Sequence, residues 1–257
     1  DTQDYDCADV LGSMFVLCTV KDCVSIHPQD FARGTTEVLA DEIERKYVGE
    51  TIVDLGLVMA FFDFDELAQG FIYPADGTAR YDVAFRLVCF RPFVGEVLTG
   101  VISSADKDGL RVSMNFFDDV VIPGHFLQSP SEYRAEENLW VWKYENEDED
   151  EDEDADPDAE SVFAFNVGEP IRFRVRSINF TQVHSTLSGR QALTTSTHLE
   201  SAAGSVKPEN DDIPPPPTSV RRRSSSVDLT KSEPEPPVMQ IIGLVNEDGL
   251  GLVSWWS

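Results

Sequence analysis

Three arginines alternate with apolar residues in the segment 169–178 of the sequence. They are Arg172, Arg174 and Arg176. On a β-strand, residues two apart share one face and lie about 6.6 Å apart, which is close to the spacing of phosphates along a nucleic-acid strand. The pattern predicts a row of guanidinium groups that contacts RNA, with Arg111 as a fourth candidate. The alternative is a solvated strand face whose arginines form ion pairs with a nearby acidic segment.

No group of residues in the sequence has the pattern of a catalytic or metal site. Asp118 and Asp119 end a predicted strand, where paired aspartates are more often turn residues than metal ligands. The four cysteines form no CxxC pair and the four histidines stand far apart, so neither a zinc site nor a nucleophile–base pair is predicted. We therefore expect a non-enzymatic protein without a metal or cofactor, whose cysteines are buried free thiols.

The sequence is strongly acidic, with a formal net charge of −27 at pH 7. Twelve acidic residues fall within residues 145–160, and residues 147–154 are all acidic. Phosphate is repelled by such a field, so nucleic acid is expected to bind weakly and only at a locally basic face. The acidic run separates two predicted strands, 139–144 and 161–167, and is interpreted as a hairpin insertion. It is either a disordered, solvated loop or a docking site for a basic partner.

The segment 90–123 predicts the first three strands of a small β-barrel. An apolar stretch broken by glycines leads into a turn at residues 106–109, and apolar and polar residues then alternate over residues 110–115. A short strand at residues 120–122 ends at a proline. This order is typical of an OB-fold, a barrel that commonly binds oligonucleotides.

An open sheet with one helix is predicted ahead of the barrel, over residues 14–90. Residues 14–20 are apolar and indicate a buried strand, and Thr35–Tyr47 has the periodicity of an amphipathic helix. Further strand patterns follow at residues 51–62, 71–73 and 79–90. The sequence therefore predicts a β-α-β-β-β domain, preceded by an unstructured extension over residues 1–13.

The composition changes after the predicted barrel, which spans residues 91–184. Residues 185–237 are rich in Ser, Thr, Pro and Glu and predict a disordered linker. An arginine triplet inside it precedes Ser224, Ser225 and Ser226 and is similar to a basophilic kinase site, a motif that also arises by chance.

Residues 238–257 are predicted to return to the barrel as its closing strand. Loop closure costs only about 0.6 kcal/mol per doubling of length, so a long linker permits this return. Trp255 and Trp256 are expected to be buried there, because two tryptophans are costly to leave in water. The expected class is α+β: an N-terminal β-α-β-β-β domain followed by an OB-fold barrel with disordered acidic and Ser/Pro-rich insertions.

Six segments resemble one known protein family. They are MFVL at Met14, FRPFVGEVL at Phe90, NFFDDVVIP at Asn115, LWVWKYE at Leu139, EPIRFRV at Glu169 and GLGLVSWW at Gly249. The resemblance covers residues 14–175 and 238–256 and is to the large stalk subunit of eukaryotic RNA polymerase III. Polymerase II and archaeal counterparts share the two-domain plan, but the FFDD-to-proline segment and the paired terminal tryptophans favour the polymerase III member. The chain departs from the family in its first residues, its long acidic run and its linker.

The resemblance implies a non-catalytic subunit located in the nucleus. In this family the N-terminal tip domain docks on the polymerase core and pairs with a smaller helical stalk subunit. The OB-fold lies near initiation factors and emerging single-stranded RNA. The turn between the last two strands of the tip domain then supplies the candidates for partner docking, which are Pro74, Asp76 and Gly77.

Two other classes of protein remain open from the residues alone: a free-standing OB-fold RNA-binding factor, and an acidic-loop chaperone of basic proteins. Affinity purification followed by mass spectrometry distinguishes the three, because it would recover polymerase subunits, scattered ribonucleoproteins or histones. We expect a soluble intracellular protein without membrane contact, since the sequence has no signal peptide and no apolar run of bilayer-spanning length.

Overall fold

The computed structural model describes residues 5–10, 14–144, 161–186, 189–199, 220–229 and 235–256. The chain divides into two units, Asp1–Phe93 and Val94–Ser257, which we call the tip unit and the barrel unit. Both consist mainly of β-strands, and α1 (Thr35–Tyr47) is the one α-helix within the described ranges. The predicted α+β class is confirmed.

The tip unit is built around one antiparallel sheet with the strand order β1-β2-β6-β4-β3, in which β5 also pairs with β6. Its strands are β1 (Tyr5–Val10), β2 (Phe15–Ile26), β3 (Thr51–Ile52), β4 (Gly56–Leu67), β5 (Phe71–Ile72) and β6 (Ala79–Phe90). A short 3₁₀ helix, Pro28–Asp30, precedes α1. β6 is the central strand, because it pairs with β2 along its whole length and with β4 on its other side.

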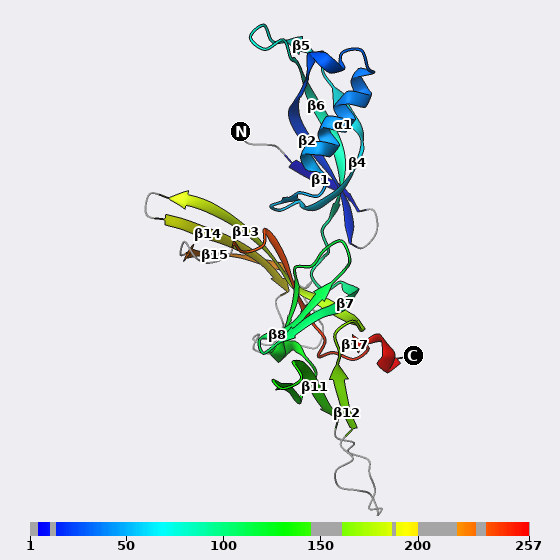
Figure 1. Ribbon diagram of the computed structural model, residues 1–257, viewed down its shortest axis with the longest axis vertical. Helices are drawn as coiled ribbons and strands as arrows, with labels where there is room; N and C mark the ends of the chain where they lie inside the picture. Colours follow the sequence, from blue (N-terminus) through cyan, green and yellow to red (C-terminus); the bar gives the residue numbers. More distant parts are fainter. Residues whose placement is uncertain are drawn as a thin grey trace, which may run out of the picture. The chain divides into compact units, whose positions relative to one another are not determined.

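Helix α1 lies against one face of this sheet and closes the core of the tip unit (Figure 1). The predicted apolar face of the helix is confirmed, since its buried residues are Val38, Leu39, Ile43 and Tyr47. These side chains pack against alternate residues of β2 and β6, among them Val20, Phe85 and Leu87, which are fully buried. Alternation places one face of each strand against the helix, which is why the sequence pattern predicts this layer well.

The first residues of the chain join the sheet. We predicted an unstructured extension over residues 1–13, whereas Tyr5–Val10 forms β1 and pairs with β2 from Tyr5↔Val20 to Val10↔Val16. The acidic composition concealed this strand, because pairing uses backbone hydrogen bonds and an edge strand tolerates charged side chains. Residues 1–4 and 11–13 lie outside the described ranges.

A closed five-stranded barrel forms the centre of the barrel unit. Its strands are β7 (Val97–Asp106), β8 (Gly109–Ser113), β9 (Val120–Pro123), β13 (Pro170–Thr186) and β16 (Met239–Leu244). Pairing runs β7–β8–β9–β16–β13 and returns from β13 to β7; the β9–β16 pair is parallel and the others are antiparallel. A five-stranded Greek-key barrel is the architecture of an OB-fold, so the predicted fold class is confirmed.

The end of the chain closes this barrel. β16 lies between β9 and β13, and the short strand β17 (Gly251–Leu252) also pairs with β13. A 3₁₀ helix, Val253–Trp256, follows. Trp255 packs among other aromatic rings, but the expected burial of Trp256 is wrong, because this side chain is 55% exposed.

A small antiparallel sheet, β10-β11-β12, belongs to the barrel unit and carries the acidic insertion. Its strands are β10 (Ser131–Arg134), β11 (Leu139–Tyr144) and β12 (Ser161–Phe165), and a 3₁₀ helix, Gly124–Phe126, precedes them. β11 and β12 form the predicted hairpin, in register from Trp140↔Phe165 to Tyr144↔Ser161. The polar composition of residues 129–138 favours a helix or loop, but residues 131–134 form β10, which pairs with β11. Residues 145–160 lie outside the described ranges, so their disorder stays a prediction.

Deleting residues 147–154 is expected to leave the fold intact. The hairpin register is set by the β11–β12 pairs and by Trp142 and Phe163, whose ring centroids lie 5.4 Å apart. Eight adjacent like charges add repulsion rather than burial. The melting temperature of the deletion variant should therefore stay within a few degrees of that of the full chain. A control in which Gly/Ser residues replace the run separates loop length from charge. A larger fall in the deletion variant alone would show that the length of the loop is needed, and a larger fall in both variants would make the acidic residues part of the fold.

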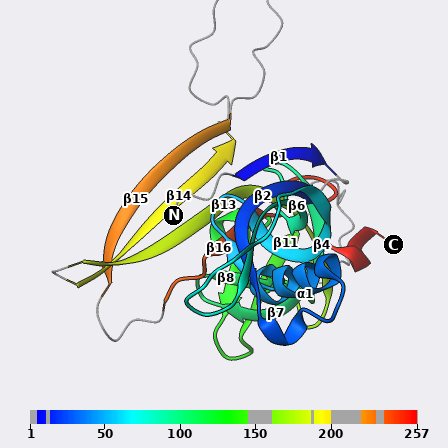
Figure 2. The same cartoon turned by 90° about the horizontal axis from the view of Figure 1, so that it is seen from above.

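The predicted linker contains two long strands. β13 continues to Thr186, pairs with β14 (Gly189–Leu199), and β14 pairs with β15 (Val220–Leu229), so that the three extend from the barrel as a curved ribbon (Figures 1 and 2). The prediction of a disordered segment over residues 185–237 is thus wrong for these strands. The segments 187–188, 200–219 and 230–234 lie outside the described ranges.

Threonine explains why composition misled the prediction of this ribbon. Thr is polar enough to suggest a linker, yet its β-branched side chain favours extended backbone. Thr181 of β13 and Thr194 of β14 face each other with their hydroxyl oxygens 2.9 Å apart, and Ala192 is buried nearby in sequence. A cross-strand ladder of this kind stabilises paired strands without a large apolar core.

Candidate functional sites

β13 carries the three predicted arginines on the outer wall of the barrel. The apolar residues between them are fully buried, namely Ile171, Phe173 and Val175. Arg172 is exposed and lies between β7 and β17, and Arg174 is partly exposed on the same side of the alternation. The sequence therefore predicted correctly which side chains point inward along this part of the strand.

The arginines do not form an even row. Arg174 Nε lies 3.1 Å from Glu247 Oε2, so an ion pair already holds this guanidinium. Arg176 falls at a β-bulge, because the register with β16 passes from Val175 directly to Ser177. The structure thus presents one exposed arginine, one that is ion-paired and one displaced at a bulge.

Arg111 lies apart from the other three arginines. It sits on β8 opposite Ser104 of β7, whereas Arg172 sits opposite Thr99 of the same strand. Five residues of extended strand correspond to about 16 Å. Arg111 Nε also lies 3.4 Å from Asp106 Oδ2. Arg111 therefore lies apart from the arginines of β13, and its contact with RNA stays a prediction.

The predicted docking residues of the tip unit shape a turn between β5 and β6. Asp76 Oδ1 accepts hydrogen bonds from Thr78 N at 3.0 Å and from Thr78 Oγ1 at 2.8 Å. The backbone bond comes first among the causes that lower the pKa of Asp76. Gly77 has a φ of +72°, in a region that glycine enters at little cost. Pro74 is exposed in the same turn, so all three residues define the shape of the loop.

Apolar side chains beside this turn are uncovered. Phe71 is 64% exposed and Ile72 is 60% exposed, and Tyr73 follows them with the Arg80 guanidinium 4.4 Å from its ring centroid. β5, which bears the first two, lies at one end of the tip unit (Figure 1). The exposure of this patch was not predicted from the sequence, because a short apolar strand is ordinarily taken to be buried.

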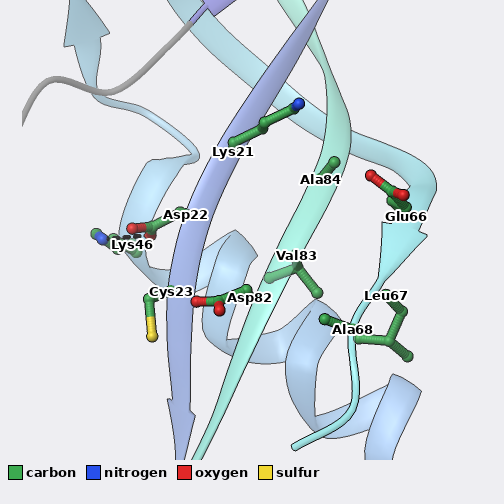
Figure 3. A pocket seen from close by; sticks show the side chains of 10 residues that line it. All are labelled: Lys21, Asp22, Cys23, Lys46, Glu66, Leu67, Ala68, Asp82, Val83 and Ala84. Carbon is green, nitrogen blue, oxygen red and sulfur yellow. Dashed lines mark hydrogen bonds and ion pairs between the residues drawn. The ribbon is translucent and has the colours of Figure 1, made fainter.

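A depression of about 880 Å³ crosses β2, β6 and the end of β4 in the tip unit (Figure 3). Lys21, Lys46, Asp22, Glu66 and Asp82 place both signs of charge around it. Such mixed charge gives no preference for phosphate, so this depression is not a candidate nucleic-acid site.

Two titratable groups of this depression are structural. Burial raises the pKa of Asp22, but hydrogen bonds from Lys46 Nζ at 2.6 Å and Tyr47 Oη at 2.8 Å outweigh it and lower the pKa overall. These bonds tie β2 to α1. Burial, followed by the neighbouring Asp82, raises the pKa of Cys23 and keeps this thiol protonated, which disfavours nucleophilic chemistry.

The paired aspartates after β8 do not assemble a metal site. Burial and the adjacent Asp118 raise the pKa of Asp119, and Asp118 Oδ1 accepts a hydrogen bond from Ser113 Oγ. Within the described ranges, no three His, Cys, Asp or Glu side chains are grouped to hold a metal ion. The same ranges contain no helix that is long and apolar enough to cross a membrane.

The two units match known domains in the order in which they occur. Residues 21–77 match the SHS2 domain found in the N terminus of Rpb7p, Rpc25p and MJ0397. A tip of this type followed by an OB-fold barrel places the chain in the Rpb7-like class of RNA polymerase subunits. Residues 96–256 match RNA polymerase III subunit Rpc25. The chain belongs to the Rpc25 family.

Full-length relatives agree with this assignment. The chain is 33% identical over 244 residues to DNA-directed RNA polymerase III subunit rpc8 of Schizosaccharomyces pombe, covering 95% of this chain and 100% of the relative. It is 30% identical over 245 residues to the RPC8 subunit of Saccharomyces cerevisiae, with the same coverage. The polymerase II subunit RPB7 of Saccharomyces cerevisiae is 26% identical over 127 residues, which are 49% of this chain and 74% of that subunit. The predicted resemblance to the polymerase III family is confirmed.

Proposed function

We propose that this chain is the large, non-catalytic stalk subunit of RNA polymerase III and supports transcription initiation in the nucleus. The observation that carries the proposal is the match to polymerase III subunits along both units, whereas the polymerase II subunit matches about half of the chain. The initiation factors and the polymerase core are its proposed partners.

The exposed turn of the tip unit supports the proposed docking on the polymerase core. Phe71, Ile72 and Tyr73 form an uncovered apolar patch, and such patches mark binding surfaces more often than isolated exposed residues do. A cavity of about 240 Å³ beside the patch is lined in part by Phe31 and Tyr81 and adds concave surface to it. The smaller helical stalk subunit is the second proposed partner of this unit.

Affinity purification of the endogenous chain, followed by mass spectrometry, tests this proposal. We expect stoichiometric polymerase III subunits and, after dissociation of the core by salt, a heterodimer with one small helical subunit. Recovery of scattered ribonucleoproteins would favour a free-standing OB-fold RNA-binding factor, and recovery of histones would favour a chaperone. A chain that runs only as a free monomer on size exclusion would contradict the stalk assignment.

Weak contact with emerging single-stranded RNA is the proposed role of the outer face of β13. Arg172 is exposed there and Arg176 is partly exposed. Arg174 must first leave Glu247 before it can bind a phosphate. The net charge of −27 opposes capture of RNA from solution. The face would therefore guide RNA that the polymerase has already delivered.

Replacing Arg172 and Arg176 with glutamine is expected to abolish this RNA binding without changing thermal stability. At roughly 0.7 per phosphate contact for single strands, two contacts give a slope of log affinity against log salt of about −1.4 in the unmodified chain. Titration of a labelled oligouridine at several salt concentrations measures the affinity and this slope. Arg111→Gln is the matched control, since Arg111 is exposed but distant. An unaltered RNA affinity in the double variant would return the arginines of β13 to a role as a solvated strand face.

A further inference from the structure

A cavity of about 460 Å³ in the barrel unit is lined mainly by aromatic rings and carboxylates. The rings are those of Trp142 on β11, Phe163 on β12, and Trp255 and Trp256 at the end of the chain. The carboxylates are those of Glu247 and Asp248, which lie between β16 and β17. We call this site the aromatic pocket. Its volume lies within the range of pockets that hold small ligand groups.

The aromatic pocket is already built in the free chain. The Trp255 ring centroid lies 5.2 Å from that of Trp142 and 5.6 Å from that of Phe163. A Cβ atom on Gly251 would lie 2.5 Å from Trp255 Cζ3, so only glycine lets this ring pack so closely on the backbone. Trp256 Nε1 donates a hydrogen bond to the Leu250 carbonyl at 3.2 Å, which fixes the second indole.

The exposure of Trp256 is not explained by folding. Its indole is held by a hydrogen bond and yet remains 55% exposed, so most of its apolar surface stays in water. Burying this surface would stabilise the protein by about 2 kcal/mol. A guest in the aromatic pocket would recover part of that burial.

The chemistry of the lining favours a cationic guest. The face of an indole or phenyl ring carries negative potential and attracts ammonium and guanidinium groups. The carboxylates of Glu247 and Asp248 add negative charge at the same place. RNA bases also stack on aromatic rings, but these carboxylates repel the phosphates that accompany each base. Because Glu247 already pairs with Arg174, we expect Asp248 to be the main charge partner of the guest.

The acidic insertion is attached to the same site. Residues 145–160 connect β11 to β12, the strands that carry Trp142 and Phe163, and they contain twelve acidic side chains. Their field attracts a basic segment over about one Debye length, roughly 8 Å at physiological ionic strength. Long-range attraction by the insertion and short-range contact in the pocket therefore select the same kind of partner.

We propose that the aromatic pocket binds an arginine or lysine side chain from a basic peptide segment of a partner protein. The proposal goes beyond the stalk assignment, because the tip unit takes no part in it. The pocket is linked to the face of β13 through the ion pair of Glu247 with Arg174.

Peptide binding to the purified full chain tests the proposal. The probes are short labelled peptides that alternate glycine with arginine, with lysine or with glutamate, together with a labelled oligouridine. We expect the arginine and lysine peptides to raise the fluorescence anisotropy and to change the tryptophan emission, because three of the four tryptophans line the pocket. The glutamate peptide and the oligouridine should leave the emission unchanged.

Two variants locate the bound side chain. Trp256→Ala and Asp248→Asn are each expected to lower the affinity for the arginine peptide about fivefold. This corresponds to the loss of one cation–π or charge contact. Both side chains are exposed, so thermal stability should be unchanged. Phe116→Ala and Glu136→Gln are matched controls at exposed positions of the same unit and should bind as the unmodified chain does.

Salt separates the pocket from the acidic insertion. Deleting residues 147–154 should lower the affinity for the arginine peptide at low salt. The effect should be much smaller at high salt, where the Debye length falls below about 8 Å. The fivefold effect of Trp256→Ala should persist at high salt. Unchanged binding in both pocket variants would overturn the proposal. So would oligouridine binding that Trp256→Ala abolishes, because the pocket would then stack bases.

Discussion

A chain that ends at Pro237 is expected to lose the folded barrel while keeping the tip unit. β16 pairs with both β9 and β13, so its removal opens the barrel at two strand interfaces. The lost segment also contains six buried apolar residues: Met239, Ile241, Leu244, Val245, Leu250 and Leu252. At about 2 kcal/mol each, these contribute on the order of 10 kcal/mol, which is comparable to the whole net stability of a domain. Calorimetry should show one remaining transition, that of the tip unit.

The matched control removes only Trp256 and Ser257. Since the Trp256 side chain is largely exposed, this shorter deletion should leave the melting temperature of the barrel nearly unchanged. Limited proteolysis could contradict the closing role of β16. If a cut before Val238 released the C-terminal segment and the barrel kept its protection from further cleavage, β16 could not be the strand that closes the fold.

Among the elements that were predictable from sequence, α1 and β13 are buried on one side. Leu39, Ile43 and Tyr47 recur at helical spacing because α1 rests on a single sheet face. Ile171, Phe173 and Val175 recur at strand spacing because β13 has the barrel interior on one side and solvent on the other. In both elements the period of the apolar residues is a direct consequence of the packing geometry.

The elements that were missed are held by pairing rather than by apolar periodicity. β1 is acidic and β14 is rich in threonine, and each is recruited by the free edge of a neighbouring strand. The bulge at Arg176 depends on the register between β13 and β16, which are separated by more than fifty residues in the chain. Such information is absent from a local pattern, because the partner strand decides it.

The candidate sites were likewise predictable only where a single strand carries their residues. The arginines of β13 were found because one strand carries them, but their link to Glu247 joins β13 to a loop after β16. The aromatic pocket combines β11, β12 and the chain terminus, so no sequence window contains it. The sequence did indicate that Trp255 and Trp256 need a partner surface, and the structure supplies Trp142 and Phe163 for the first of them.

Replacing Phe71 and Ile72 with serine is expected to lower the recovery of polymerase core subunits at least tenfold in affinity purification. Both side chains are more than half exposed in the free chain, so burying them against a partner would contribute about 1.5–3 kcal/mol each, whereas their loss costs the isolated tip unit little. The melting temperature of the tip unit should therefore stay the same. Val48→Ser is the matched control, since Val48 is an exposed apolar residue beyond α1. If the double variant recovered the core subunits as well as the unmodified chain does, the docking surface would not include the β5 turn.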